Sequence, residues 1–231
     1  MSIPFAINVK HLCKEYDIHK HARVGEKNFK VLDDISFQLK KGESLAIVGR
    51  NGSGKSTLLS ILSSITSPSS GSVQINGRIV SLLELGAGFH NDLSGRENLR
   101  VYAAMLGLSR KEIAERYSSM VAFGDMAEFM NMKVRQYSSG MKVRLAMGIA
   151  LHTNPDILIA DEVFSVLDMS FVSKCMDELK KLRDSVSLIL VDHRTDRLRE
   201  LCDCGLWLEQ GKVKDIGELA NVIECYEDHS K

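Results

Sequence analysis

The chain has 231 residues, which is enough for one well-buried α/β domain. Thirty basic residues balance thirty acidic ones, and this zero net charge argues against a general nucleic-acid binder, which carries a basic excess. No stretch approaches the ~20 apolar residues of a membrane span, and residues 1–5 lack the layout of a signal peptide. We therefore expect a cytosolic protein that can dock on a membrane partner.

The N-terminal half begins with strand-like runs at residues 6–9 and 31–39, which flank a polar stretch at 17–28 that reads as a loop. Residues 45–48 form a short continuous apolar run, which is typical of a buried parallel strand. A Gly-rich loop follows, and leucines at helical spacing predict a helix that begins near Lys55.

The second half is mostly helical from about residue 95 to 153, with no convincing strand. Alternation of strand and helix then returns, with strands at 157–160 and 188–191 and a helix near 170–183. The pattern predicts a parallel-sheet core that is interrupted by a helical insert and has an antiparallel edge at its front. The five cysteines are few and scattered, and we expect ordinary reduced thiols.

Residues 49–56 match G-x-x-x-x-G-K-[ST] at every fixed position, between an apolar strand and an amphipathic helix. Glycines allow the backbone N–H groups to face phosphates, Lys55 reaches the β and γ oxygens, and the Ser56 hydroxyl suits Mg²⁺. The alternative is a Gly/Ser-rich turn that happens to contain a lysine. The motif predicts nucleotide binding without choosing between kinase, GTPase and ATPase. Its candidate binding residues are Gly49, Asn51, Gly52, Ser53, Gly54, Lys55, Ser56 and Thr57.

Two carboxylates, Asp161 and Glu162, end the apolar strand that begins at Ile157. Beside a phosphate loop, the first suits a magnesium partner and the second a general base that activates water. Capping of the next helix is the alternative, and the pair alone does not decide.

A second anion-binding helix start is predicted at residues 137–141, where Ser138 and Gly140 open a helix. Two such ends in one chain suggest that a phosphate is gripped from both sides, and a plain capped helix is the alternative. His193 follows the strand at 188–191, where a γ-phosphate sensor would be wanted, although a lone histidine there is more often a surface residue.

In this order, the motifs resemble the nucleotide-binding subunits of ABC transporters over essentially the whole chain. The resemblance implies a P-loop NTPase of the α/β class. It would have a RecA-like parallel-sheet core, an N-terminal antiparallel β subdomain and an inserted α-helical subdomain, all within one domain at 1–231 with the insert at about 95–153. It implies ATP and Mg²⁺ as cofactors, with Glu162 as the catalytic glutamate and His193 as the switch histidine.

Further residues take roles from the same resemblance. Tyr16 matches the aromatic residue that stacks on adenine, with a plain edge-strand tyrosine as the alternative, and residues 165–168 match the D-loop. The chain departs from the pattern in reading Tyr-Ser-Ser-Gly-Met at 137–141, in offering Glu84 where a metal-sensing glutamine is usual, and in having Asp192 before the histidine.

The stretches 83–90 and 93–98, together with 137–141, resemble bacterial exporters of capsule, O-antigen or teichoic acid chains. The chain ends soon after the core, so we expect no sugar-binding extension. The family architecture implies a homodimer in the closed state, with Ser138 and Gly140 of one subunit closing on ATP held by the other. It also implies a separate membrane-spanning permease, a peripheral location on the cytoplasmic face of the inner membrane, ATPase activity coupled to transport, and no nucleic-acid partner.

Three alternatives remain open at this point. A soluble ATPase of the same superfamily that acts on nucleic acid or ribosomes would usually have two such domains or a long coiled coil. A small-molecule kinase would need a lid with arginines. A non-catalytic module would be expected to lack Glu162 or His193, and both are present.

Overall fold

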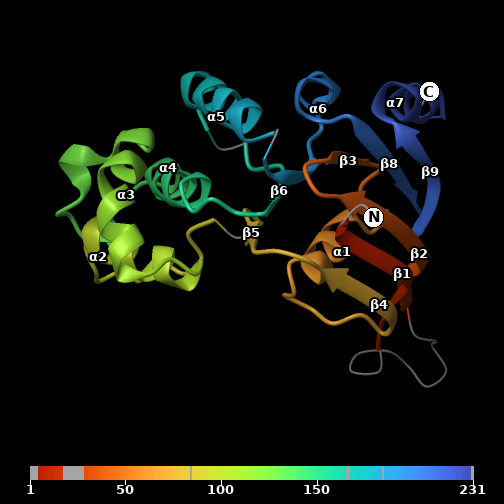
Figure 1. Cartoon of the computed structure of the whole chain (residues 1–231), viewed down its shortest axis with the longest axis horizontal. Helices are drawn as coiled ribbons and strands as arrows, with labels where there is room; N and C mark the ends of the chain where they lie inside the picture. The colour runs from red at the N-terminus through yellow and green to blue at the C-terminus, as the bar shows by residue number, and fades with distance from the viewer. Residues whose placement is uncertain (1–4, 18–28, 84, 165–166, 184, 230–231) are drawn as a thin grey trace. The chain divides into compact units, whose positions relative to one another are not determined.

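The computed structural model describes residues 5–17, 29–83, 85–164, 167–183 and 185–229 (Figure 1). The chain forms two compact units, each assembled from separate parts of the sequence. The sheet unit contains Met1–Ile79, Asp156–Asp161 and Leu182–Lys231, and the helical unit contains Val80–Pro155 and Glu162–Lys181. A short strand, β5 (Ile79–Ser81), lies where the chain first passes from the sheet unit into the helical unit.

The N-terminal part of the sheet unit is a three-stranded antiparallel sheet in the order β2-β1-β4 (Figure 1). Its strands are β1 (Phe5–Tyr16), β2 (Phe29–Lys40) and β4 (Ser70–Ile75). Along β2 the residues alternate between buried and exposed from Ile35 to Lys40. This period of two is what a sheet with one covered face produces, and the predicted antiparallel edge is therefore present.

The second sheet is six-stranded, and after β5 its other five strands follow in the order β6-β7-β3-β8-β9, all in the sheet unit. They are β3 (Ser44–Val48), β6 (Ile157–Asp161), β7 (Ser187–Val191), β8 (Cys204–Glu209) and β9 (Lys212–Glu218). The first four are parallel to their neighbours, and β9 runs antiparallel to β8. Every residue of β3 and β7 is buried, which explains why their sequences are continuous apolar runs.

Helices α1 (Lys55–Leu62), α6 (Thr195–Leu201) and α7 (Leu219–His229) complete the sheet unit. The sequence patterns correctly predicted α1, β3, β6 and β7, but they revealed neither β4 nor the elements that follow His193. All five cysteines are free thiols, as expected, and burial raises the pKa of the Cys175 thiol to about 12.

The helical unit holds α2 (Gly95–Met105), α3 (Arg110–Phe123), α4 (Ser139–Leu151) and α5 (Met169–Leu182), with short 3-10 turns at Ala127–Phe129 and Val134–Gln136. Capping boxes start α2 and α3, because Ser94 pairs with Glu97 and Ser109 pairs with Glu112. Among the described residues, no helix combines the length and the apolar character needed to cross a bilayer.

Candidate functional site

The loop between β3 and α1 depends on three glycines whose φ angles lie in the left-handed region. A Cβ on Gly49 would lie 2.1 Å from the Leu208 carbonyl oxygen, and one on Gly54 would lie 2.7 Å from the Leu32 side chain. Gly52 (φ 80°) has open space around it, so there the backbone conformation alone requires glycine. The three glycines therefore hold the loop in a tight turn, a backbone shape in which N–H groups can bind phosphate oxygens.

Lys55, the first residue of α1, folds back over this loop and is 8% exposed. Its Nζ donates hydrogen bonds to the carbonyl oxygens of Gly49, at 2.7 Å, and of Arg50, at 3.1 Å. Ser53 is 4% exposed, and its hydroxyl has no hydrogen-bond partner among the described residues. A buried hydroxyl and a buried ammonium in one glycine-lined loop fit an anionic ligand with several oxygens.

The predicted magnesium partners lie together in the sheet unit. The Ser56 hydroxyl donates to Asp161 Oδ2 at 3.0 Å, which joins the first turn of α1 to the carboxyl end of β6. A hydroxyl and a carboxylate beside a phosphate loop are the hard oxygen ligands that Mg²⁺ takes. Thr57 is half-buried in the same turn, while Asn51 is exposed in the loop. The third metal candidate, Glu84, lies outside the described residues.

His193 is exposed just beyond β7 and lines a small hollow of about 50 Å³ together with Lys55 and Gly49. Thr195 and Tyr226 also line this hollow, and no sequence motif pointed to either of them. The structure thus places the predicted histidine beside the phosphate loop, at the carboxyl ends of neighbouring parallel strands.

Asp192 holds the turn that carries His193. Its carboxylate accepts a hydrogen bond from the Arg194 backbone N–H at 2.8 Å and pairs with Arg197 at 3.1 Å. The two side chains of the ion pair are only 10% and 15% exposed. The unusual aspartate therefore fixes the start of α6 and, with it, the backbone of the histidine.

Glu162 follows β6 directly, is half-buried and has a φ of 49°. A non-glycine residue in the left-handed region costs roughly 1–3 kcal/mol and is frequent at functional sites. Helix capping does not account for the pair Asp161 and Glu162. The next helix, α5, begins at Met169, and it is Asp168 that accepts from the Phe171 backbone N–H.

The second predicted anion site lies at the start of α4 in the helical unit. The exposed Ser138 is the N-cap, and its hydroxyl accepts from the Met141 N–H at 3.2 Å. A Cβ on Gly140 would meet only the Ser138 hydroxyl, at 3.9 Å. Packing within the described chain therefore does not require glycine here, unlike at Gly49.

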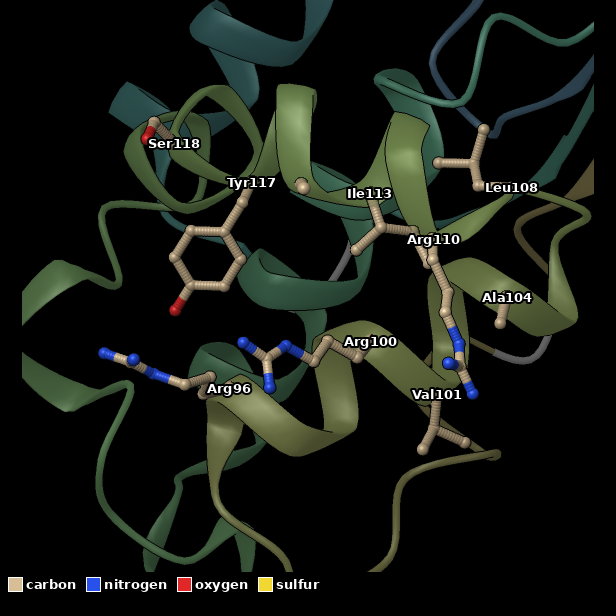
Figure 2. A pocket seen from close by; sticks show the side chains of 10 residues that line it. Arg96, Arg100, Val101, Ala104, Leu108, Arg110, Ile113, Tyr117 and Ser118 are labelled. Atoms are coloured by element: carbon tan, nitrogen blue, oxygen red, sulfur yellow. The ribbon is translucent and has the colours of Figure 1, made fainter.

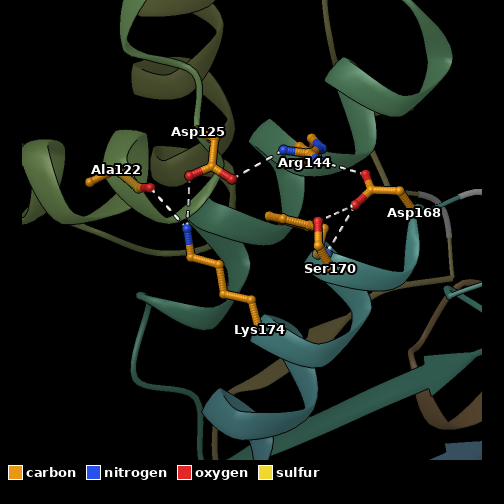
Figure 3. Close-up of polar contacts among 7 residues, drawn as sticks. Ala122, Asp125, Arg144, Asp168, Ser170 and Lys174 are labelled. Atoms are coloured by element: carbon orange, nitrogen blue, oxygen red, sulfur yellow. Dashed lines mark hydrogen bonds and ion pairs between the residues drawn. The ribbon is translucent and has the colours of Figure 1, made fainter.

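Sequence reasoning missed an ion network that ties α4 to α5 (Figure 3). Arg144 of α4 pairs with Asp168 and also with Asp125, at 3.1 Å, and Asp125 pairs with Lys174 of α5 at 2.9 Å. The guanidinium of Arg144 also lies 4.6 Å from the centre of the Phe171 ring. Hydrogen bonds from Ser170 and Arg144 hold the pKa of the Asp168 carboxyl well below its usual range.

Asp168 is the last residue of the predicted D-loop, of which residues 165–166 lie outside the described part. In the sequence, Arg144 is marked only as a basic residue six positions after Ser138. No sequence pattern indicates that Arg144 pairs with Asp168. Tyr16 lies at the end of β1, where it is 45% exposed and the Lys14 ammonium is 4.9 Å from its ring centre. This leaves a ring face near solvent, and its role stays a prediction.

Comparison with known proteins identifies the family. The family described as "ABC transporter" matches residues 32–165. The O-antigen export system ATP-binding protein RfbB of Klebsiella pneumoniae is 37% identical, covering 95% of this chain and 96% of that protein. The teichoic acids export ATP-binding protein TagH of Levilactobacillus brevis is 38% identical, covering 100% of this chain and 67% of that protein.

Solved structures agree with the fold. The ATP-binding subunit of an ABC transporter superposes with a TM-score of 0.82 at 24% identity, covering 96% of this chain and 93% of that one. A dimeric post-hydrolysis ATP-binding cassette bound to ADP and Pi superposes with a TM-score of 0.77 at 26% identity, covering 92% and 98%. These likenesses confirm the predicted α/β P-loop NTPase fold. The chain belongs to the ABC transporter family, as one of its ATP-binding, ATP-hydrolysing subunits.

Proposed function

We propose that the chain powers the export of polysaccharide chains by hydrolysing Mg-ATP in a homodimer attached to a separate membrane-spanning permease. The nucleotide loop supports the hydrolysis part, because a buried Lys55 and the unsatisfied hydroxyl of Ser53 lie in a loop that only glycines can form. The relatives RfbB and TagH support the cargo class, because they are ATP-binding proteins of O-antigen export and teichoic acid export.

Residues of the sheet unit hold the triphosphate. The Lys55 ammonium exchanges its bonds to the carbonyls of Gly49 and Arg50 for β and γ oxygens. Ser56 and Asp161 would hold Mg²⁺, which draws charge from the β and γ oxygens when it is bound. Tyr16 supplies an exposed ring for the adenine.

Two side chains act on the attacking water and the leaving phosphate. Glu162 accepts the proton of the water as general base. Its left-handed backbone sets the direction in which its side chain leaves the end of β6. His193 reports on the γ-phosphate from the rim of the hollow that it shares with Lys55.

The second subunit completes each site. Ser138 is exposed and Gly140 has no neighbour in its own chain that excludes a Cβ, so this helix start is suited to a ligand from outside the chain. A related cassette forms a dimer with ADP and Pi. We infer that Ser138 and Gly140 of one subunit close on the ATP of the other, on the cytoplasmic face of the inner membrane.

The substitution Glu162→Gln tests the catalytic assignment. We expect ATP binding to persist while turnover falls roughly 10²–10⁴-fold, the usual size of a general-base contribution. Nucleotide titration and phosphate release measure the two quantities. Lys55→Ala is the matched control and should weaken binding itself. Turnover near the wild-type value in Glu162→Gln would contradict the role of Glu162.

A further inference from the structure

The helical unit contains a hollow of about 710 Å³ between α2 and α3, and no residue of the nucleotide motifs is among those that line it (Figure 2). Its floor is apolar or small, and its charged residues are three arginines, Arg96, Arg100 and Arg110. In Figure 2 the guanidinium groups of Arg96 and Arg100 point to the same side as the Tyr117 hydroxyl, whereas the guanidinium of Arg110 lies on the other side of the view, beside Val101. A hollow of this size, mostly apolar with a few polar groups, has the character of a small-ligand pocket.

The three arginines differ from the other basic residues of α3. Lys111 pairs with Glu115 and Arg116 pairs with Glu112 along that helix. Across the described residues, by contrast, no carboxylate lies within ion-pair distance of Arg96, Arg100 or Arg110, and no Asp or Glu lines the hollow.

The charge of Arg100 acts on one carboxylate, that of Glu97, but the Glu97 oxygens are hydrogen-bonded to Ser94. Glu97 accepts bonds from the backbone and the hydroxyl of Ser94, and these bonds, ahead of Arg100, lower its pKa. The Arg96 guanidinium lies 5.9 Å from the centre of the Tyr117 ring. Three like charges around one hollow in a chain of zero net charge therefore favour an anion.

The apolar part of the hollow restricts which anion fits. Val101, Ala104, Leu108 and Ile113 form the floor. Val101 is 45% exposed, and Met105, one turn further along α2, is 67% exposed. A sugar phosphate or free phosphate would satisfy the arginines and leave these side chains in water, whereas a hydrocarbon chain would cover them.

We propose that this hollow binds an anionic membrane phospholipid. The phosphate lies between Arg96 and Arg100, because planar guanidinium groups bind phosphate in a bidentate way. The first part of an acyl chain lies beside Val101 and Ala104, toward Arg110 at the other side of the hollow (Figure 2). The membrane as source of the ligand rests on the proposed function, which places the chain at a bilayer. The site would hold the helical unit against the lipid next to the permease.

The test is flotation of the purified full chain with vesicles of phosphatidylcholine containing or lacking phosphatidylglycerol. The triple variant Arg96→Gln/Arg100→Gln/Arg110→Gln should lose on the order of 100-fold in partitioning to the anionic vesicles, from ~5-fold per arginine. The control Lys10→Gln/Lys41→Gln/Lys214→Gln removes the same charge from exposed positions of the sheet unit and should lose far less. Ala104→Glu, which places a carboxylate on the floor, should mimic the triple variant. Melting temperatures and ATPase turnover should stay at wild-type values.

Several outcomes would overturn the proposal. Equal losses in the triple variant and its control would mean general charge attraction. Competition by millimolar inorganic phosphate or glycerol phosphate would mean a soluble anion. The triple variant could also float like the wild type and yet fail to co-purify with the permease. That result would mean that an acidic segment of the permease, and not a lipid, fills the hollow. Flotation needs neither ATP nor the permease, so a negative result here is separable from a failure of the proposed function.

Discussion

Gly49 and Gly140 both belong to predicted phosphate-binding turns, but their surroundings differ. At Gly49 the left-handed backbone and the Leu208 carbonyl oxygen, 2.1 Å from an added Cβ, require glycine for the fold itself. At Gly140 the backbone is helical and the space is open. A glycine that the fold does not require is explained by a ligand or partner that must approach the backbone closely.

This contrast gives a matched pair of variants. Gly49→Ala should lower the free energy of unfolding by about 1–3 kcal/mol, through overpacking and strain. Gly140→Ala should leave it unchanged or raise it by roughly 0.5–1 kcal/mol, because alanine is the better helix former. The second variant should nonetheless lose at least about tenfold in ATPase turnover. Urea unfolding and phosphate release measure these effects, and full activity in Gly140→Ala would remove the case for phosphate contact there.

At the scale of residues, the sequence predicted what is local. The phosphate loop from Gly49 to Thr57 is a contiguous motif, so its spacing carries its geometry. Asp192 shows the limit, because its role depends on Arg197, in the first turn of α6, and on burial that no spacing reveals. The orphan hydroxyl of Ser53 is likewise a property of three-dimensional packing.

At the scale of elements, the ion network connects α4 to α5 within the helical unit. Arg144 bridges Asp125 and Asp168 (Figure 3). Its guanidinium also lies over the Phe171 ring. Ser138 lies at the start of α4, and Asp168 ends the predicted D-loop. We therefore expect a movement of the Ser138 turn to be transmitted through Arg144 to Asp168.

Replacing Arg144 should uncouple these elements. Arg144→Gln should lower turnover by about tenfold or more with little change in the affinity for ATP, whereas Lys174→Gln leaves the bond to Asp168 intact and should have a smaller effect. Arg144→Lys keeps the charge without the planar fork and should restore only part of the activity. Steady-state kinetics separate the two parameters, and equal effects of Arg144→Gln and Lys174→Gln would assign the network to stability alone.

The pH dependence of stability gives an independent check on the same carboxylate. The pKa of Asp168 is lowered in the folded chain by Ser170, Arg144 and the Phe171 N–H. A carboxyl group whose pKa is lowered by folding stabilises the folded chain at every pH above the pKa that the same group has in the unfolded chain, near 3.9 for Asp. This stabilisation is lost as the pH falls below that value. The unfolding free energy of Arg144→Gln should therefore fall less steeply below about pH 4 than that of the wild type.

Element prediction succeeded where burial leaves a pattern. β3 and β7 are buried at every residue, so each reads as an apolar run. β4 and β9 contain exposed and half-buried residues only, and neither strand has a fully buried residue. These two strands are defined by backbone hydrogen bonds, those of β4 to β1 and those of β9 to β8, and not by side-chain burial. Backbone pairing leaves no hydrophobic pattern in the sequence.

At the scale of the whole molecule, the proposed function requires two copies of the chain and a membrane partner. With Mg-ATP, Glu162→Gln should sediment as a dimer because the γ-phosphate that bridges the subunits is retained, while Lys55→Ala should stay monomeric. Purification from membranes should yield a multi-spanning protein with the wild type. A soluble monomer with ATP, or co-purification with ribosomes or DNA, would favour the alternative of a soluble ATPase.

The sequence by itself determined the family, the nucleotide loop, the acid pair and the order of the core elements, because each is written in contiguous residues or in a burial period. The tertiary structure decided what depends on residues far apart in the chain. It placed Ser56 against Asp161 and His193 beside Lys55, joined Arg144 to Asp168, and gathered three arginines around an apolar hollow. These pairings arise from the register of parallel strands and from helix packing, which fix which distant residues meet, and no local pattern encodes them.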